Sequence, residues 1–114
     1  MDNCIFCKIV RGEVPAKIIL DSDETLAFYD VDPKAPVHIL IIPKAHIGSI
    51  MEAGGENAGT FEAMGRAARE LAVKLGLNES GFRIIVNTGR DGGQTVQHLH
   101  MHLLGGRSLE WPPG

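Results

Sequence analysis

Residues 98–104 read His-Leu-His-Met-His-Leu-Leu, so polar and apolar side chains alternate along this stretch. Successive side chains point to opposite faces of a β-strand, and the pattern therefore predicts three imidazoles on one face. The other face carries Leu99, Met101 and Leu103 and must contact the hydrophobic core. The chain must therefore contain a sheet with its core, under a helix, on one side and a row of histidines on the other.

The rest of the chain supplies the elements for such a sheet. Apolar and β-branched runs predict strands at 17–20, 25–29, 38–42, 82–86 and 96–104, and the first three, joined by short turns, favour an antiparallel meander. Apolar residues spaced three and four apart predict one main helix between 58 and 75, ended by Gly76. Residues 6–10 predict a short N-terminal helix. We expect an α+β fold with about five antiparallel strands, in a single domain over residues 1–114.

Composition excludes several classes of protein. The net charge of −3 argues against binding nucleic acid through its phosphates. The longest apolar run, 39–42, is far shorter than the ~20 residues that cross a bilayer, so we expect no membrane partner. The two cysteines are too few for a disulfide framework, and no basic stretch followed by an apolar run indicates a signal peptide. These observations predict a cytoplasmic protein.

The row of histidines favours covalent chemistry over a single metal ion. Alternate residues of a strand are ~6.6 Å apart, so one zinc ion could bind two neighbouring histidines but not easily all three. A central imidazole held in one tautomer can instead attack an electrophile. The loop 92–95, Gly-Gly-Gln-Thr, comes just before this strand and offers donors for a phosphate. The alternative is a solvated polar face, where Ser, Thr or Lys would be more usual.

Cys4 and Cys7 form an isolated C-x-x-C pair. A thioredoxin-like redox motif is one interpretation, but no strand precedes the pair as that arrangement requires. A tetrahedral zinc site is the other, and it needs two further ligands, for which histidine is the available residue type.

Residues 98–104 resemble the signature of the histidine triad (HIT) superfamily. Segments 14–19, 42–44, 91–96 and 104–114 are similar to its branch of histidine triad nucleotide-binding proteins, so the resemblance covers nearly the whole chain. It implies a HIT-like fold and a homodimer that pools strands into one larger sheet. It also implies a site for purine nucleotides such as AMP or GMP, without an organic cofactor. The implied activity is hydrolysis of nucleoside 5′-phosphoramidates through a nucleotidyl-histidine intermediate.

The resemblance assigns roles to particular residues. His100 would be the nucleophile, His102 would contact the phosphate oxygens, and His38 would match a fourth histidine that hydrogen-bonds the nucleophile; His98 completes the catalytic set. The residues that would grip the phosphate are Asn87, Gly93, Gln94 and Thr95, the last replacing a serine common in the family. Asp30 would bind the ribose hydroxyls. The base would be walled by Val31, Phe6, Ile9 and Phe28, although Phe28 could equally be a core aromatic. Trp111 would reach the site of the partner protomer.

Superfamily members with the N-terminal cysteine pair bind structural zinc, and the resemblance gives the ligands here as Cys4, Cys7, His46 and His98. The alternative for His46 is an ordinary surface histidine. A zinc ligand at His98 could not shuttle protons, so protonation of the leaving group would fall to His38, His102 or solvent. Three other functions compete with the phosphoramidase: a non-catalytic nucleotide-binding interaction module, a dinucleoside polyphosphate hydrolase or nucleotidyl transferase of the same superfamily, and a zinc-storage protein.

Overall fold

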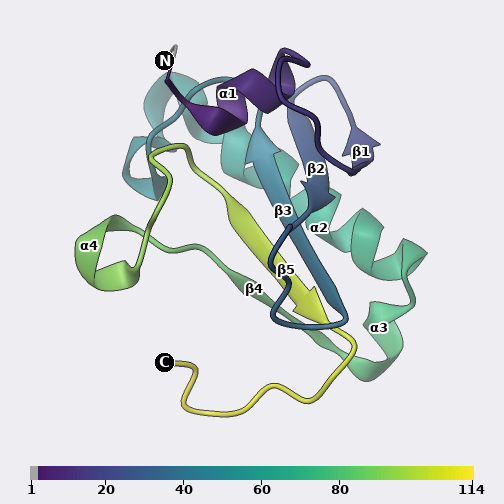
Figure 1. Ribbon diagram of the computed structural model, residues 1–114. Coiled ribbons are helices and arrows are strands. Elements are labelled where there is room, and N and C mark those ends of the chain that lie inside the picture. Colours follow the sequence, from purple (N-terminus) through teal and green to yellow (C-terminus); the bar gives the residue numbers. More distant parts are fainter. Residues whose placement is uncertain (1–2) are drawn as a thin grey trace.

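The computed structural model describes residues 3–114, and its five strands form one antiparallel sheet in the order β1-β2-β3-β5-β4 (Figure 1). The predicted α+β class, the five strands and both predicted helices are confirmed. Residues 1–2 of the predicted domain lie outside the described part. In chain order the elements are α1 (Ile5–Val10), β1 (Ile18–Asp21), β2 (Thr25–Tyr29), β3 (Val37–Pro43), η1 (Ile50–Glu52), η2 (Gly55–Asn57), α2 (Ala58–Lys74), α3 (Leu77–Ser80), β4 (Phe82–Ile85), α4 (Gly89–Gly92) and β5 (Met101–Gly105).

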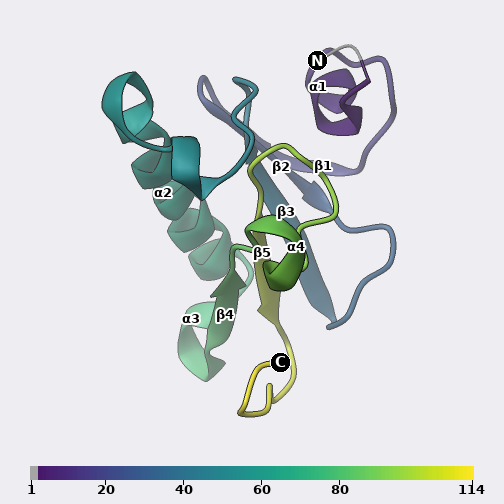
Figure 2. The same cartoon turned by 90° about the vertical axis from the view of Figure 1, so that its left-hand side faces the viewer.

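Both faces of the sheet are covered, which explains why β3 is apolar from Ile39 to Pro43. Ile39 and Ile41 belong to the larger core cluster, together with residues of α2. Leu40 and Ile42 point the other way and pack with Phe6 of α1 in a second cluster. The sheet thus lies between α2 and α1 (Figure 2). A strand covered on both faces loses the alternation of polar and apolar residues that a half-exposed strand shows.

Helix α2 forms the layer over the larger core. Its buried residues are small apart from Met64 and Leu71, which lets the helix lie close to the sheet. The helix ends as predicted, because Gly76 takes a left-handed backbone conformation with φ of 74°. Within residues 3–114, no helix combines the length and the apolar character needed to cross a membrane.

The last strand is shorter than the sequence predicted. The prediction placed its start at residue 96, whereas β5 begins at Met101, opposite Ile41 of β3. The hydrogen bonds between β3 and β5 stop near Pro43, because proline has no N–H to donate. The N–H of Leu99 instead donates to the main-chain oxygen of Ile47 at 2.6 Å. The side chains still alternate between the faces, since Leu99, Met101 and Leu103 all lie in the larger core.

Two segments between the predicted helices and strands contain short helices of their own. Residues 77–80 form α3, and residues 89–92 of the glycine-rich segment form the single turn α4. Gly93, with φ of 80°, ends α4 in a conformation that favours glycine. The segment before the histidines is therefore an ordered turn.

Candidate active site

The histidine row lies on the face of the sheet that α1 covers. The ring of Phe6 on α1 makes edge contacts with His98 at 5.8 Å and His100 at 5.2 Å between ring centroids. His102 follows, 5.2 Å from His100. His98 and His100 are buried and His102 is half-buried. Helix α1 thus places the ring of Phe6 against His98 and His100. The histidines lie on the sheet face opposite α2, as the alternation of polar and apolar residues predicted.

The tautomer of His100 follows from a main-chain contact. Its Nδ1 atom lies 2.8 Å from the main-chain oxygen of His98. A carbonyl oxygen only accepts hydrogen bonds, so Nδ1 carries a proton, and in the neutral ring Nε2 keeps its lone pair. A lone pair on a fixed ring is what a histidine nucleophile needs.

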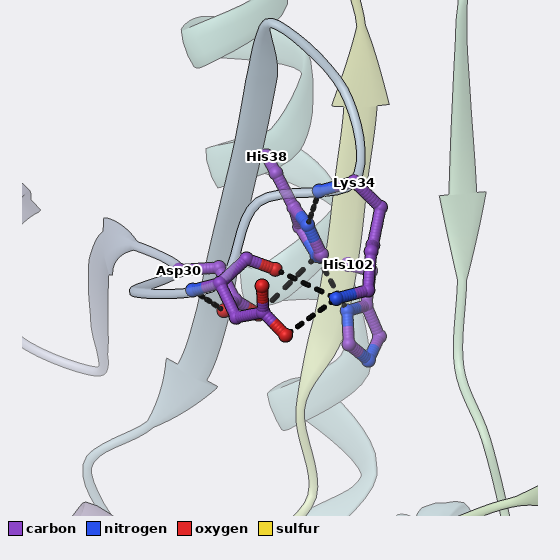
Figure 3. A network of polar contacts seen from close by, with 5 residues as sticks. Asp30, Lys34, His38 and His102 are labelled. Atoms are coloured by element: carbon purple, nitrogen blue, oxygen red, sulfur yellow. Dashed lines mark hydrogen bonds and ion pairs between the residues drawn. The ribbon is translucent and has the colours of Figure 1, made fainter.

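His38 and His102 form a second fixed pair (Figure 3). The main-chain N–H of Lys34 donates to Nδ1 of His38 at 3.0 Å, so in the neutral ring the proton lies on Nε2. This Nε2 lies 3.0 Å from Nδ1 of His102 and 3.4 Å from a carboxylate oxygen of Asp30. Nδ1 of His102 therefore accepts, and its Nε2 carries a proton. The sequence led us to expect His38 to bond His100; it bonds His102.

Both rings of this pair are neutral at pH 7. Burial lowers the pKa of His38, although Asp30 opposes this shift. Burial also lowers the pKa of His102 to about 4, with smaller contributions from His100 and His38. A neutral pair makes the assignment of one proton to each ring self-consistent.

The glycine-rich segment uses most of the donors that we expected to face a phosphate. The side chain of Gln94 is buried; it accepts from the N–H of Gly89 and donates to the main-chain oxygens of Gly48 at 2.7 Å and Val96 at 2.9 Å. The N–H of Gln94 bonds Gly89, and that of Gly93 bonds Arg90. Gln94 therefore holds this segment in shape, and its predicted phosphate contact stays a prediction.

Thr95 and Asn87 differ from Gln94 in this respect. Within residues 3–114, neither side chain has a hydrogen-bond partner in the protein; Thr95 is exposed and Asn87 is half-buried. Of the four predicted phosphate-binding residues, these two keep polar side-chain atoms available to a ligand.

The residues predicted to contact the nucleoside occupy two different environments. Asp30 and Val31 lie in the loop after β2, where Asp30 is half-buried beside His38 and Val31 is 99% exposed. Phe6, Ile9 and Phe28 are buried in the smaller core cluster. They lie beneath the site as part of this core and do not form an exposed surface beside it. The position of Phe28 agrees with the alternative interpretation, an aromatic residue of the core.

Four side chains from distant parts of the chain meet beside His100. Cys4 Sγ lies 3.3 Å and Cys7 Sγ 3.6 Å from Nδ1 of His98, and Cys7 Sγ lies 3.2 Å from Nδ1 of His46. All four possible ligand atoms lie within 4.8 Å of one another. A tetrahedral zinc ion with Cys and His ligands implies S···N separations of about 3.5 Å, so the residues fit such an ion.

The protonation of this cluster also suits a metal. Nε2 of His98 lies 2.8 Å from the main-chain oxygen of Pro43 and carries the proton, which leaves the Nδ1 lone pair facing the sulfurs. Burial raises the pKa of the Cys7 thiol, and neighbouring Cys4 raises it further. A cation is therefore needed to hold this sulfur as a thiolate.

Asp30, His38 and His102 also bring their ligand atoms within 4.8 Å of one another. A metal at Nε2 of His38 would move the proton to Nδ1, against the N–H of Lys34. Two donors would then face each other, so this second cluster suits a hydrogen-bonded chain better than a metal ion.

The sequence model of the HIT domain matches residues 11–109, most of the chain. The protein belongs to the HIT family. It is similar along its length to an uncharacterised HIT-like protein of Synechococcus elongatus, with 51% identity over 113 residues, 99% of this chain and 98% of that one. It is 44% identical to the purine nucleoside phosphoramidase of Escherichia coli over 108 residues, 95% of this chain and 91% of that one.

Solved HIT structures agree with the fold. A HIT family hydrolase from Legionella pneumophila superimposes with a TM-score of 0.95 at 46% identity, covering 98% of this chain and all of that one. A histidine triad protein from Clostridium difficile gives a TM-score of 0.92 at 42% identity, covering 96% and 95%. The predicted HIT-like fold is confirmed, and the chain is a member of the HIT hydrolase family.

Two contributions to this HIT site escaped the sequence. The donor that fixes His38 is the main-chain N–H of Lys34, which no residue pattern reveals. The second is a contact of the tail: Trp111, 82% exposed, lines a cavity of about 610 Å³ with Asn87 and Ile84 of its own chain. Its predicted reach into a partner's site stays a prediction.

Proposed function

We propose that this protein hydrolyses the P–N bond of purine nucleoside 5′-phosphoramidates, with His100 as the nucleophile. The observation that carries the proposal is the contact of His100 Nδ1 with the oxygen of His98, which leaves the lone pair of the neutral ring on Nε2. The ring of His102 lies 5.2 Å away between centroids. The 44% identity to a purine nucleoside phosphoramidase supports the same reaction class.

In the first step, Nε2 of His100 attacks the α-phosphorus and forms a P–N bond to the ring. The bond to the leaving amine breaks, its electron pair goes to that nitrogen, and the amine takes a proton from solvent. The positive charge on the phosphorylated ring is stabilised because Nδ1–H still donates to the His98 oxygen. The N–H of His102 donates to a phosphate oxygen. Water then attacks phosphorus, the bond to Nε2 breaks, and the nucleoside monophosphate leaves as a proton passes to solvent.

The remaining contacts follow the chemistry of the ligand. Asp30 binds the ribose hydroxyls, because a carboxylate accepts from a vicinal diol. Thr95 and Asn87 donate to the phosphate, and Val31 contacts the base above the floor made by Phe6. The purine is adenine or guanine.

The test is a substrate screen with adenosine and guanosine 5′-phosphoramidates, following release of the monophosphate by chromatography. Wild type should release AMP and GMP, and His100→Ala should lose about 10³-fold or more in kcat, as expected when a nucleophile is removed. Met51→Ala, at a side chain 81% exposed in η1, is the control and should retain full activity. Full activity of His100→Ala would overturn the proposal. AMP binding by calorimetry without any turnover would favour the interaction module, and cleavage of dinucleoside polyphosphates alone would favour the related hydrolase branch.

We also propose that Cys4, Cys7, His46 and His98 hold a structural zinc ion. The support is the set of S···N distances of 3.2 to 3.6 Å and the orientation of the His98 lone pair. When bound, zinc would supply charge for the two thiolates and a link between α1 and the sheet. Metal analysis of protein purified without added zinc should find one zinc per chain; a value near zero would contradict this assignment.

A homodimer through the β4 edge is the third part of the proposal. β4 is an edge strand, and it carries Phe82 and Ile84 with 40% and 41% of their surface exposed. Trp111 exposes a further apolar surface beside the same strand. Exposed apolar edge strands invite pairing with another strand, and a second copy of this chain would provide one.

A further inference from the structure

The geometry points to Arg107 as a positioning residue that acts through the main chain of Lys34 to fix the proton of His38, and with it the proton of His102. The structural part of this inference stands on the hydrogen bonds alone. Its catalytic consequence rests on the proposed function.

Arg107 grips the main chain of Lys34 with two donors. Its Nε and Nη2 atoms donate to the oxygen of Lys34 at 3.1 and 2.9 Å, and its Nη1 donates to the oxygen of Ser108 at 3.0 Å. A guanidinium presents these donors in a rigid, planar fork, so the contact sets direction as well as distance.

Lys34 connects this grip to the active site by its other main-chain group. Its N–H donates to Nδ1 of His38, while its side chain points elsewhere and pairs with Asp32 at 2.5 Å. A continuous chain of contacts therefore runs from Arg107 through Lys34 and His38 to Nδ1 of His102 (Figure 3 shows the last three residues). It joins the segment after β5 to the histidine row.

The turn that carries Arg107 also lies directly against the loop that carries Lys34. A Cβ atom at Gly106 would come within 2.9 Å of Pro36 Cβ, and the φ of 90° at Gly106 further favours glycine. The close approach keeps Arg107 within reach of the Lys34 oxygen. The carboxylate of Asp30 is held by a separate contact, because it accepts from the N–H of Asp32 at 2.8 Å.

The consequence concerns which nitrogen of His102 carries the proton. While Lys34 donates to Nδ1 of His38, His38 donates to His102, and Nε2 of His102 is a donor. If the Lys34 N–H shifts, the ring of His38 loses the shorter of the two contacts that favour its tautomer and keeps only the one between Nε2 and Asp30 at 3.4 Å. His102 can then take the proton on Nδ1 and present a lone pair, which repels a phosphate oxygen. Arg107 therefore affects kcat without touching the substrate.

The experiment uses the full-length protein labelled with ¹⁵N-histidine, with Arg107→Ala and Arg107→Lys compared with wild type. In the NMR spectrum a ring nitrogen without a proton resonates well downfield of one with a proton. Wild type should show Nδ1 of His38 unprotonated and Nε2 protonated. Both variants should bring these two signals closer together, even though Arg107→Lys keeps the charge. We expect kcat to fall about fivefold, the effect of roughly one hydrogen bond, with KM changed less than about twofold because Asp30 is held separately.

Arg66→Ala is the matched control. Arg66 is an exposed arginine of α2 that pairs with Glu62 at 2.8 Å and takes no part in the contacts from Arg107 to His102. This variant should change neither the histidine signals nor the kinetics. Unchanged His38 signals and unchanged kcat in both Arg107 variants would overturn the inference. If wild type does not cleave phosphoramidates, the proposed function fails, but the ¹⁵N signals still decide the role of Arg107.

Discussion

The main-chain oxygen of His98 accepts from Nδ1 of His100 at 2.8 Å, while the side chain of His98 faces Cys4 and Cys7. One residue therefore contributes its main chain to the proposed nucleophile and its side chain to the proposed metal site. Whatever holds the ring of His98 also holds the acceptor that selects the tautomer of His100. The proposed metal site and the proposed nucleophile therefore share one residue, and the proposed zinc would be structural, with no part in the reaction.

Removing zinc should therefore affect stability and α1 together. Two of the four ligands lie at the start of α1, so a chelator should lower Tm, with a loss of about 2 kcal/mol or more in the free energy of unfolding. Amide hydrogen exchange of residues 5–10 should rise while that of α2 stays slow. Calorimetry and mass spectrometry measure these effects. The double variant Cys4→Ser, Cys7→Ser should not respond to the chelator, and equal responses of the two proteins would contradict a metal at these residues.

Folding stability should depend on pH through His102. Its pKa is about 4 in the folded protein against an ordinary value of 6.5, so between these values the unfolded chain binds more protons. The stabilisation is complete above pH 6.5 and is lost as pH falls towards 4. Because the ring is only half-buried, we expect a loss of about 1 kcal/mol between pH 7 and 5 from this group. Urea unfolding of wild type and His102→Gln measures it. The variant's curve should be flatter, and parallel curves would contradict the prediction.

Ile41 should be among the most important residues for stability. Its side chain is fully buried between the sheet and α2. Ile41→Ala should lower the free energy of unfolding by about 2–5 kcal/mol, because a cavity remains in a tightly packed core. Denaturant unfolding gives the value, and Met51→Ala, at an exposed position, should change it by less than about 0.5 kcal/mol. A small effect at Ile41 would mean that the core rearranges to fill the space.

The two edges of the sheet offer a matched test of the proposed dimer. Ile84→Lys on β4 places a charge at the proposed interface and should convert the protein to monomers. Ile18→Lys makes the same change on the opposite edge strand, β1, at a similarly exposed side chain (48% against 41%), and should leave the mass unchanged. Light scattering coupled to size-exclusion chromatography distinguishes the outcomes. A monomeric wild type, or equal effects of both variants, would contradict a dimer through β4.

The sequence predicted this site best where side chains alone determine it. The alternation of residues 98–103 placed the histidines opposite the larger core, where Leu99, Met101 and Leu103 lie. Contacts that depend on main-chain atoms could not be predicted. The N–H of Lys34 and the oxygen of His98 select two tautomers, and every residue type except proline offers the same main-chain atoms.

Gln94 illustrates a second limit of prediction from sequence. Its amide is of the right type and in the right segment to bind a phosphate, and the sequence alone could not show that Gly89, Gly48 and Val96 already use its polar atoms. Which polar atoms remain available depends on the fold around them, because a buried amide must satisfy its own hydrogen bonds first. The hydroxyl of the neighbouring Thr95 is exposed, so water can satisfy its hydrogen bonds and a ligand can replace that water.

The cluster of Cys4 and His98 has a consequence for how the chain acquires its structure. The two residues are 94 positions apart and meet at 3.3 Å. During synthesis Cys4 emerges early, whereas His98 emerges only when most of the sheet has been made. Because contacts between distant positions form late, α1 should dock last, after β3 and β5 have paired. Phe6, beneath the proposed nucleophile, should then reach its place only in the final step of folding, and a chain without docked α1 should lack the proposed activity.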